Sequence, residues 1–330
     1  MKKDIEEKII RLLENGEALQ SSIYRALDVS KSRVSEVLKD LEERNIIRRE
    51  RIGKNYVVSL NSYIRESGNL LKIGIIRSSE YGYIIPLRKI IKDKGYELEV
   101  RIYESGVEVM KDLVMGKLDF GISPAISQIF FAYAGFPVKI IAPAGSGGGY
   151  LFSTATDRKP RTLSSRLSTM EMILRTAVNS SLIRDPSSVD YFDDPMKALN
   201  EYLNGKADAI TVWEPFATIL RSEGKKETFS YSEIEHYCCT LSAHSSLKES
   251  VVESFRKYFF ESINIYEKNR SGFAFSYSAL LDLPYGLVER TLKHYTYHHD
   301  VDISILEKQL SYAGITVPSP SVLRSVMLGS

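Results

Sequence analysis

One pattern occurs twice in this chain and limits the folds that the chain can adopt. Residues 110–122 (MKDLVMGKLDFGI) and 196–210 (MKALNEYLNGKADAI) each contain an amphipathic helical stretch, a Gly-Lys-x-Asp turn and a short apolar run. Glycine suits the left-handed residue that ends a helix, because it has no Cβ to clash. The apolar run is typical of a buried strand in a parallel sheet. Each copy therefore predicts a helix followed by a buried strand.

A proline-containing turn follows each copy, at Ser123-Pro124 and at Trp213-Glu214-Pro215. Proline is tolerated in the first turn of a helix, so each strand is expected to lead into a new helix. A helix N-terminus at the carboxyl end of a parallel strand is a favoured place to bind a polar ligand. Two such places predict two α/β lobes that face each other across a cleft.

Apolar strands alternate with helices from residue 71 onward, as a parallel sheet requires. The glycine run at residues 145–149 lacks the Lys-Ser/Thr ending of a phosphate-binding loop, so we interpret it as the crossing between the lobes. The chain is expected to cross back near Tyr237. These boundaries place residues 71–148 and 237–330 in the first lobe and residues 149–236 in the second.

Composition narrows the class of protein. The chain has 330 residues and a net charge of +2, so its length suits about two domains and no global basic excess points to nucleic acid. Cys238 and Cys239 are the only cysteines, and adjacent cysteines rarely pair, which favours a reducing compartment. Acidic residues interrupt the N-terminal stretch where a secretory signal needs an apolar core. Residues 129–144, the most apolar region, are too few to span a bilayer. We therefore expect a cytoplasmic protein without membrane contact.

Residues 1–66 predict a separate small domain. Apolar residues at helical spacing mark two helices, and a third helix begins after Ser30, a good N-cap. Residues 46–60 then alternate as the two strands of a hairpin. The polar face of the third helix and the basic hairpin suit base edges and phosphates. The candidate DNA contacts are Lys31, Ser32, Arg33, Ser35, Lys39, Arg48, Arg49, Arg51 and Lys54.

The stretch DVSKSRVSEVLKDLEERNIIRRERIGKNYVV resembles the winged helix-turn-helix of archaeal and bacterial transcription regulators. The resemblance implies binding to double-stranded DNA, and by analogy a homodimer or higher homo-oligomer. The alternative is a small helical interaction domain whose arginines form only a solvated face. Glu42, Glu43 and Glu50 interrupt the basic surface, so the base contacts are less firmly indicated than the fold. Residues 67–70 are the predicted linker to a ligand-binding domain at 71–330.

Four segments carry a second resemblance: Tyr83–Pro86, GYELEVRIYESGVEVMKDLVMGKLDFGISP, FPVKIIA and LNGKADAITVWEPF. In order and spacing they resemble the solute-binding proteins of sulfonate, nitrate and taurine importers and the related proteins of thiamine-pyrimidine synthesis. The resemblance covers nearly all of residues 71–328. It implies a periplasmic-binding-protein-like type II fold that closes around a small molecule. Carried over by position, the cleft would be lined by Ser78, Tyr81, Tyr83, Glu104, Ser105, Ser123, Arg166, Ser168, Thr169, Trp213 and Glu214.

Two groups of residues raise the question of catalysis or metal binding. The thiamine-pyrimidine relatives carry a dense cysteine cluster on the crossing strand, whereas residues 236–240 (HYCCT) keep two cysteines. No cofactor lysine and no Ser-His-Asp set can be assigned, so we expect no enzyme activity and no cofactor. His294 and His298 are spaced to share a helical face with His299 and Asp300 nearby, but a helix C-terminus explains these residues equally well. We predict no metal site.

The sequence thus predicts an α/β protein in which an N-terminal winged helix-turn-helix precedes a two-lobed periplasmic-binding-protein-like type II domain. We expect a cytoplasmic, ligand-responsive transcription regulator. Tyr81, Tyr83 and Trp213 favour a planar effector, whereas Ser168 and Thr169 at a helix start favour an anion. An oxyanion, a sulfonate and a thiamine-precursor-like heterocycle all remain open. The alternatives are a thiamine-pyrimidine-synthesis-like enzyme and a cytoplasmic small-molecule-binding protein.

Overall fold

The computed structural model describes residues 2–14, 18–27, 29–43, 47–52, 55–60, 69–155, 157–300 and 302–316. The chain divides into two compact units, Met1–Gly68 and Asn69–Ser330. The predicted hairpin turn at Gly53 and Lys54 lies outside the described residues, as does the side chain of Arg48.

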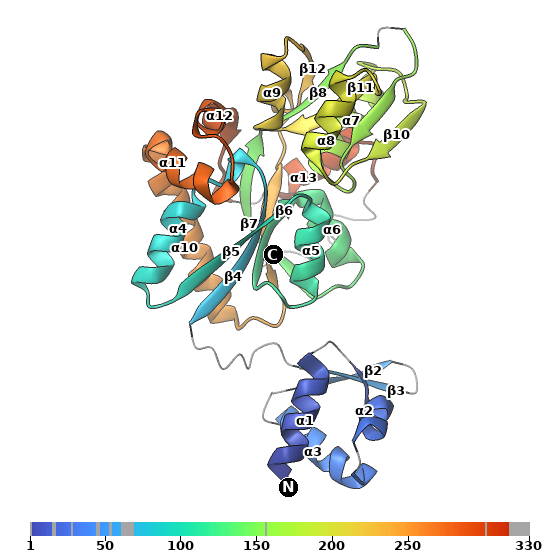
Figure 1. Cartoon of the computed structure of the whole chain (residues 1–330), viewed down its shortest axis with the longest axis vertical. Helices are drawn as coiled ribbons and strands as arrows, with labels where there is room; N and C mark the ends of the chain where they lie inside the picture. Colours follow the sequence, from blue (N-terminus) through green and yellow to red (C-terminus); the bar gives the residue numbers. More distant parts are fainter. Residues whose placement is uncertain are drawn as a thin grey trace. The chain divides into compact units, whose positions relative to one another are not determined.

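In the described residues of the N-terminal unit, three helices combine with a small antiparallel sheet (Figure 1). The helices are α1 (Lys2–Glu14), α2 (Gln20–Ala26) and α3 (Lys31–Glu43), and the strands are β1 (Ala18–Leu19), β2 (Ile47–Ile52) and β3 (Asn55–Leu60), in the order β1-β3-β2. One apolar face of each helix packs into a common core with the sheet. The buried core residues are Ile5, Ile9, Leu13, Ile23, Leu27, Val34, Val37, Leu38, Leu41, Ile47 and Val58. The helices and the hairpin follow the predicted periodicity, whereas the two-residue β1 is too short to give a sequence signal.

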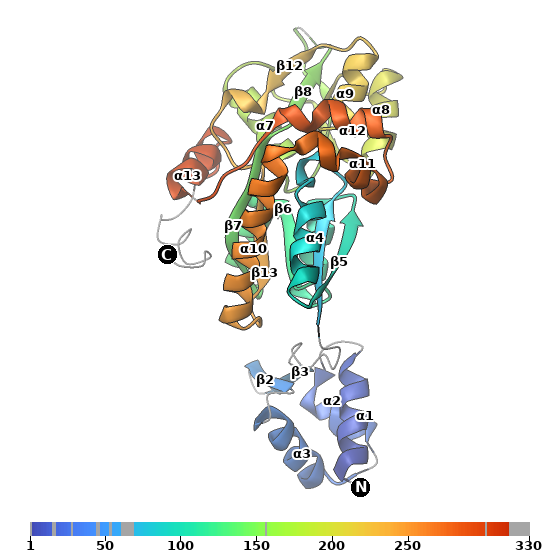
Figure 2. The same ribbon diagram turned by 90° about the vertical axis from the view of Figure 1, so that its left-hand side faces the viewer.

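The C-terminal unit contains two lobes, each built on one sheet (Figures 1 and 2). The strands of the first lobe are β4 (Leu70–Ile76), β5 (Glu97–Tyr103), β6 (Phe120–Pro124), β7 (Val138–Gly147), β13 (Cys239–His244) and β14 (Tyr295–Thr296), in the order β14-β7-β13-β6-β4-β5. Strand β4 is parallel to β5 and β6, and β13 is antiparallel to β6 and β7. Helices α5 (Gly106–Val114) and α6 (Ala125–Tyr133) cover one face of this sheet, and α4 (Ile84–Asp93) and α10 (Glu249–Lys268) cover the other. Helices α11 (Arg270–Leu281) and α12 (Tyr285–Thr291) follow α10.

The second lobe has a five-stranded sheet in the order β10-β9-β11-β8-β12. Its elements are β8 (Gly149–Ser153), β9 (Arg161–Ser164), α7 (Thr169–Asn179), β10 (Ser188–Tyr191), α8 (Pro195–Leu203), β11 (Ala209–Trp213), α9 (Phe216–Ser222) and β12 (Glu227–Ser230). Strand β9 pairs in parallel with β10 and β11, while β8 is antiparallel to β11 and β12. No helix among the described residues is long and apolar enough to cross a membrane.

The repeated Gly-Lys-x-Asp unit has the same structural role in both lobes. Gly116 and Gly205 are left-handed, with φ of +67° and +71°, and each follows a helix as predicted. The aspartate that comes three residues later anchors the first parallel strand of its lobe. Asp119 Oδ2 accepts a hydrogen bond from the main-chain N of Lys72 (2.7 Å), and Asp208 Oδ2 accepts one from that of Arg161 (3.0 Å). The motif therefore determines, within one short segment, where the helix ends, where the next strand begins and which strand lies beside it.

The chain crosses between the lobes at Gly147 and Gly148, whose φ values are +91° and +69°. A Cβ on Gly148 would lie 2.3 Å from the Tyr295 ring, so both backbone conformation and space require glycine there. After β13 the chain completes the first lobe, but the last described helix does not. Helix α13 (Ile303–Tyr312) packs against α7 of the second lobe, where Asn179 Nδ2 donates to Tyr312 O at 3.0 Å. The prediction that residues 237–330 belong wholly to the first lobe is therefore wrong for α13.

Candidate functional site

A cavity of about 30 Å³ lies between the two lobes of the C-terminal unit. By the same measure one water molecule needs about 10–15 Å³, so this space holds two or three waters. Its walls come from both lobes, and the second lobe contributes Ser165, Ser168, Thr169, Met170 and Trp213. The first lobe contributes Ile76, Ser78, Glu80, Tyr81, Ser105, Gly106, Pro124, Gly147, Cys238, Cys239 and Tyr295. A ligand larger than a few atoms therefore fits only if the lobes move apart.

The serines of the cavity lie where strands end and helices begin. Ser78 follows β4 and caps the short 3-10 helix η1 (Ser79–Tyr81), accepting from Glu80 N at 3.2 Å. Ser105 follows β5 and caps α5, and Ser168 follows β9 and caps α7. A capping serine accepts a hydrogen bond from a free N–H at the start of a helix. Because these serines line the cavity, the helices that they cap begin beside it. These three serines therefore bring the polar ends of three strand–helix turns to one place.

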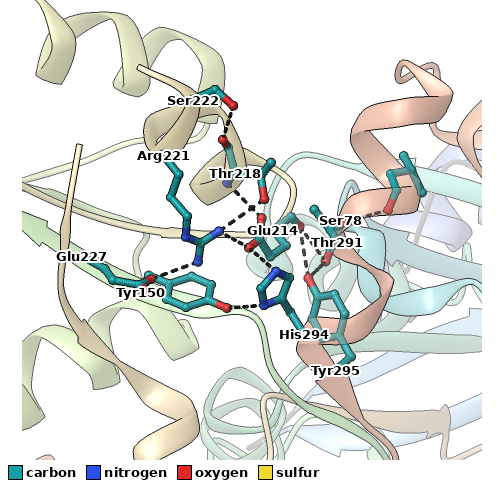
Figure 3. Close-up of polar contacts among 11 residues, drawn as sticks. Ser78, Tyr150, Glu214, Thr218, Arg221, Ser222, Glu227, Thr291, His294 and Tyr295 are labelled. Carbon is teal, nitrogen blue, oxygen red and sulfur yellow. Dashed lines mark hydrogen bonds and ion pairs between the residues drawn. The ribbon is translucent and has the colours of Figure 1, made fainter. Parts of the chain in front are cut away.

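Hydrogen bonds to one main-chain carbonyl join the lobes beside the cavity. The carbonyl oxygen of Glu214, in the second lobe, accepts from three groups of the first lobe. The donors are Ser79 N (3.2 Å), Ser78 Oγ (3.3 Å) and the Tyr295 hydroxyl (3.2 Å), and Figure 3 shows Ser78 and Tyr295 beside Glu214. The structure is thus that of a closed pair of lobes.

Two further bonds cross between the lobes at residues that line the cavity. The indole N–H of Trp213 donates to Arg77 O at 3.0 Å, and Trp213 is only 9% exposed. The Thr169 hydroxyl donates to Cys238 O at 2.9 Å. Trp213 therefore does not pack in the interior of one lobe alone but contributes to the junction of the two.

The chemically distinctive wall of the cavity consists of Glu80, Cys238, Cys239 and Tyr81. Glu80 is 1% exposed, and its Oε1 has no hydrogen-bond partner. Burial raises the pKa of Glu80 well above its usual range. Burial likewise raises the pKa of Cys239, while the hydrogen bond between the two thiols lowers that of Cys238. The Tyr81 hydroxyl lies 3.0 Å from Cys239 Sγ.

The carboxylate of Glu214, the residue after Trp213, forms a buried ion pair (Figure 3). Arg221 Nη1 donates to Glu214 Oε1 at 2.6 Å, and the guanidinium lies 4.2 Å from the centre of the Tyr150 ring. His294 Nε2 lies 3.7 Å from the same carboxylate, too far for a hydrogen bond, and its Nδ1 lies 3.0 Å from the Tyr150 hydroxyl. Burial lowers the pKa of His294. This network holds the turn that presents Glu214 O to the first lobe.

Six of the eleven predicted cleft residues line the cavity: Ser78, Tyr81, Ser105, Ser168, Thr169 and Trp213. The other five lie elsewhere, each for a clear reason. Tyr83 is buried in an aromatic cluster with Phe259, Tyr266 and Tyr297, and Ser123 accepts a hydrogen bond from Gln128 Nε2 within the first lobe. Glu104 pairs with Arg77 (2.7 Å), Arg166 stacks on Tyr191 (4.6 Å), and Glu214 turns its carboxylate toward Arg221.

The histidines that were weighed as metal ligands do not come together. His294 contacts Tyr150, His298 Nε2 lies 2.7 Å from Ser146 Oγ, and His299 packs beside Phe260. Among the described residues the group that could hold a metal ion is instead Glu80, Cys238 and Cys239. Sequence reasoning noted the cysteines without a role and missed Glu80. The available signal was the position of Glu80 between Ser78 and Tyr81, in the loop that follows the first strand.

The candidate DNA contacts whose side chains the structure describes fall into two groups. Lys31, Ser32, Arg33, Lys39 and Arg51 are exposed on α3 and β2. Two others, Ser35 and Arg49, are half-buried. Ser35 Oγ lies 2.7 Å from the Tyr24 hydroxyl, and Arg49 forms an ion pair with Glu42, donating from Nε at 2.9 Å. Ser35 and Arg49 therefore link α3 to α2 and to β2.

Comparisons with known proteins extend the fold assignment. Residues 3–61 match the family described as a domain of unknown function, DUF7343. No curated protein matches the chain. A solved ligand-binding component of an ABC-type import system from Staphylococcus aureus, with zinc bound, is 15% identical with a TM-score of 0.66, covering 78% of this chain and 99% of that one.

Two further solved structures share the architecture. The periplasmic aliphatic sulphonate-binding protein of Escherichia coli is 16% identical with a TM-score of 0.64, covering 79% of this chain and 92% of its own. The periplasmic nitrate-binding protein of Synechocystis PCC 6803 is 13% identical with a TM-score of 0.59, covering 72% and 73%. At such identities the likeness concerns the fold alone. It confirms the predicted two-lobed, periplasmic-binding-protein-like α/β fold.

Proposed function

We propose that the C-terminal unit is a receptor for a small ligand and that the N-terminal unit binds double-stranded DNA under its control. The receptor half rests on one observation: an inter-lobe cavity whose wall holds a buried carboxyl oxygen without a partner, that of Glu80. A buried polar group is costly unless it is hydrogen-bonded or paired, so a ligand that satisfies Glu80 would stabilise the closed lobes.

The lining indicates the charge of that ligand. Among the described residues that form the cavity wall, none is lysine, arginine or histidine, whereas Glu80 is acidic and both cysteines can ionise. Burial raises the pKa of Glu80, so a bound cation would offset the cost of ionising this carboxyl group, whereas an oxyanion would oppose its ionisation. The solved structures of sulphonate- and nitrate-binding proteins share the fold, but we propose that free sulfonates and nitrate are not the ligands of this chain. A cation, or a heterocycle of the thiamine-precursor type with N–H donors, suits the wall better.

The regulatory half rests on the N-terminal unit. Three helices followed by an antiparallel hairpin, with exposed Lys31, Arg33 and Lys39 on α3 and Arg51 on β2, suit a winged helix-turn-helix on duplex DNA. We propose that the protein acts in the cytoplasm as a homodimer or higher homo-oligomer. We also propose that it binds its ligand without turning it over. Closure of the lobes would then change how two N-terminal units are held on DNA.

Two measurements test the proposal separately. Fluorescence anisotropy with duplex from the gene's own upstream region should show binding that weakens steeply with salt. Thermal unfolding with thiamine precursors, sulfonates, nitrate, taurine and metal ions should show stabilisation by one class, about 2.7 kcal/mol at a hundredfold excess over the dissociation constant. No DNA binding at low salt would remove the regulatory half. Stabilisation by sulfonate or nitrate alone would refute the proposed charge of the ligand.

A further inference from the structure

Three potential metal ligands meet at one wall of the inter-lobe cavity. The two thiol sulfurs of Cys238 and Cys239 and a carboxylate oxygen of Glu80 all lie within 4.8 Å of one another, and all three residues are buried. A Cβ on Gly145 would lie 2.8 Å from Glu80 Oε1, so the glycine at that position makes room for the carboxylate. The carboxylate oxygen lacks a hydrogen-bond partner although it lies in the interior.

The spacing of the sulfurs fits a metal site better than a disulfide. Cys238 Sγ and Cys239 Sγ are 3.8 Å apart. In a tetrahedral zinc site with Zn–S bonds of about 2.3 Å, two sulfurs are separated by about 3.8 Å. A disulfide requires about 2.05 Å. The two thiols are thus already at the separation that a single tetrahedral ion imposes.

Charge and ligand type select the ion. Two thiolates and one carboxylate carry three negative charges, and no described lining residue carries a compensating positive charge. Thiolates favour soft or borderline ions such as Zn²⁺ over Mg²⁺ and Ca²⁺, which prefer oxygen ligands. The Tyr81 hydroxyl, 3.0 Å from Cys239 Sγ, can donate a hydrogen bond to the bound thiolate and orient it.

We propose that Glu80, Cys238 and Cys239 bind one thiophilic divalent ion of the Zn²⁺ type, with a fourth coordination position open to the cavity. All three ligands belong to the first lobe, so the ion can bind while the lobes are apart. The second lobe then closes over the open position through Thr169 and Trp213, which bond to the first lobe at Cys238 O and Arg77 O. This inference deepens the proposed receptor function, on which it rests for its role as effector.

The test uses Co²⁺ as a spectroscopic substitute for Zn²⁺ on the full, reduced chain after chelator treatment. One equivalent should produce thiolate-to-cobalt charge-transfer bands with the intensity of two thiolates, and Zn²⁺ should abolish them. Because the chain has two cysteines, any such band arises from this site. Cys238→Ser and Cys239→Ser should each halve the band for every bound Co²⁺. Replacing a residue that only hydrogen-bonds to a metal ligand typically lowers metal affinity by about 10–100-fold. Replacing a ligand itself should therefore lower Co²⁺ affinity by about 100-fold or more.

The carboxylate is tested by Glu80→Gln, which should keep two-thiolate bands while weakening Co²⁺ binding by a similar factor. Glu104→Gln is the matched control, because Glu104 pairs with Arg77 away from the cavity wall, and it should bind Co²⁺ as the unmodified chain does. Circular dichroism of each variant checks folding. Absence of bands from the unmodified, folded chain at saturating Co²⁺ would overturn the proposal, as would bands that survive in the double serine variant.

The outcome for the metal and the outcome for the receptor are distinguishable. If the bands appear and Zn²⁺ also changes DNA affinity, both proposals gain support. If the bands appear but Zn²⁺ leaves DNA affinity unchanged, the metal site stands and its role as effector fails. If the bands do not appear while another compound raises the unfolding temperature, the metal inference fails and the receptor proposal stands.

Discussion

Removing the arginine that neutralises Glu214 should destabilise the C-terminal unit strongly. Glu214 is completely buried, and Arg221 supplies its charged partner at 2.6 Å. Arg221→Met keeps much of the apolar volume of the side chain but leaves the carboxylate without its cation. Breaking a buried pair by removing one partner costs about 3–5 kcal/mol. Because the arginine side chain is 27% exposed, we expect the lower end of this range, about 3 kcal/mol.

Urea unfolding followed by tryptophan fluorescence measures this loss in the correct unit, because Trp213 is the only tryptophan and adjoins Glu214. A loss of about 3 kcal/mol corresponds to about 6–12 °C in the unfolding temperature of a domain of this size. Adding Glu214→Gln to Arg221→Met removes the unpaired charge and should recover most of the stability. The double-mutant cycle then gives the coupling energy of the pair.

Arg175→Met is the matched control for the loss of a cation. Arg175 pairs with Glu171 one helical turn away at 2.9 Å, and its side chain is 50% exposed. Such a surface pair contributes at most about 1 kcal/mol. If Arg221→Met costs no more than Arg175→Met, or if the second substitution fails to restore stability, Glu214 is not held as a buried ion by Arg221 and the reasoning is refuted.

Three further predictions concern DNA, pH and the crossing. Arg33→Ala should lower the slope of log DNA affinity against log salt concentration by about 1. Arg49→Ala should chiefly lower the stability of the N-terminal unit. Anisotropy titrations at several salt concentrations distinguish the two effects. Burial lowers the pKa of His294, so below its unfolded pKa of about 6.5 the unfolded chain binds a proton that the native state does not. Stability should therefore fall as pH drops from 7, by at most about 1.4 kcal/mol per pH unit from this group, and His294→Gln should flatten a urea-midpoint profile between pH 7 and 5. Gly148→Ala should cost about 2 kcal/mol or more in urea unfolding, because its φ of +69° and the Tyr295 ring both oppose a Cβ; a loss below about 0.5 kcal/mol would contradict this account.

The architecture of the lobes was predictable because its main signals are local. Gly116 and Gly205 end their helices in the left-handed conformation, and the aspartates three residues later bond to the neighbouring strand. The spacing of apolar residues and the residue types at helix ends encode such features within a dozen residues. The packing of α13 on α7 has no comparable signal. It depends on contacts between segments more than a hundred residues apart, such as that of Asn179 with Tyr312.

The same distinction explains the site. Ser78, Ser105 and Ser168 were predicted because a capping serine after a strand is a local feature. Glu80 was missed because its burial depends on distant segments: the Tyr297 hydroxyl donates to Glu80 O at 2.7 Å, 217 positions along the chain. Tyr83 was placed in the cleft because the sequence does not show that Tyr297 and other aromatic side chains surround it. Strand ends indicate where a site lies, whereas tertiary packing decides which side chains face it.

If the two units form one regulatory protein, ligand and DNA must affect each other equally. The chain enters the C-terminal unit at Asn69, and β4 begins at Leu70 and delivers Ser78 and Glu80 to the cavity at its far end. The strand that follows the N-terminal unit in the chain is therefore also the strand that leads to Ser78 and Glu80. By linkage, a ligand that changes DNA affinity by a given factor must have its own affinity changed by DNA by the same factor, about 5–150-fold in typical allosteric proteins. Titrating Zn²⁺ by Trp213 fluorescence with and without duplex measures one side of the linkage, and anisotropy with and without Zn²⁺ measures the other. Unequal factors would show that the two titrations do not report one coupled equilibrium, and two factors of one would show that the units act independently.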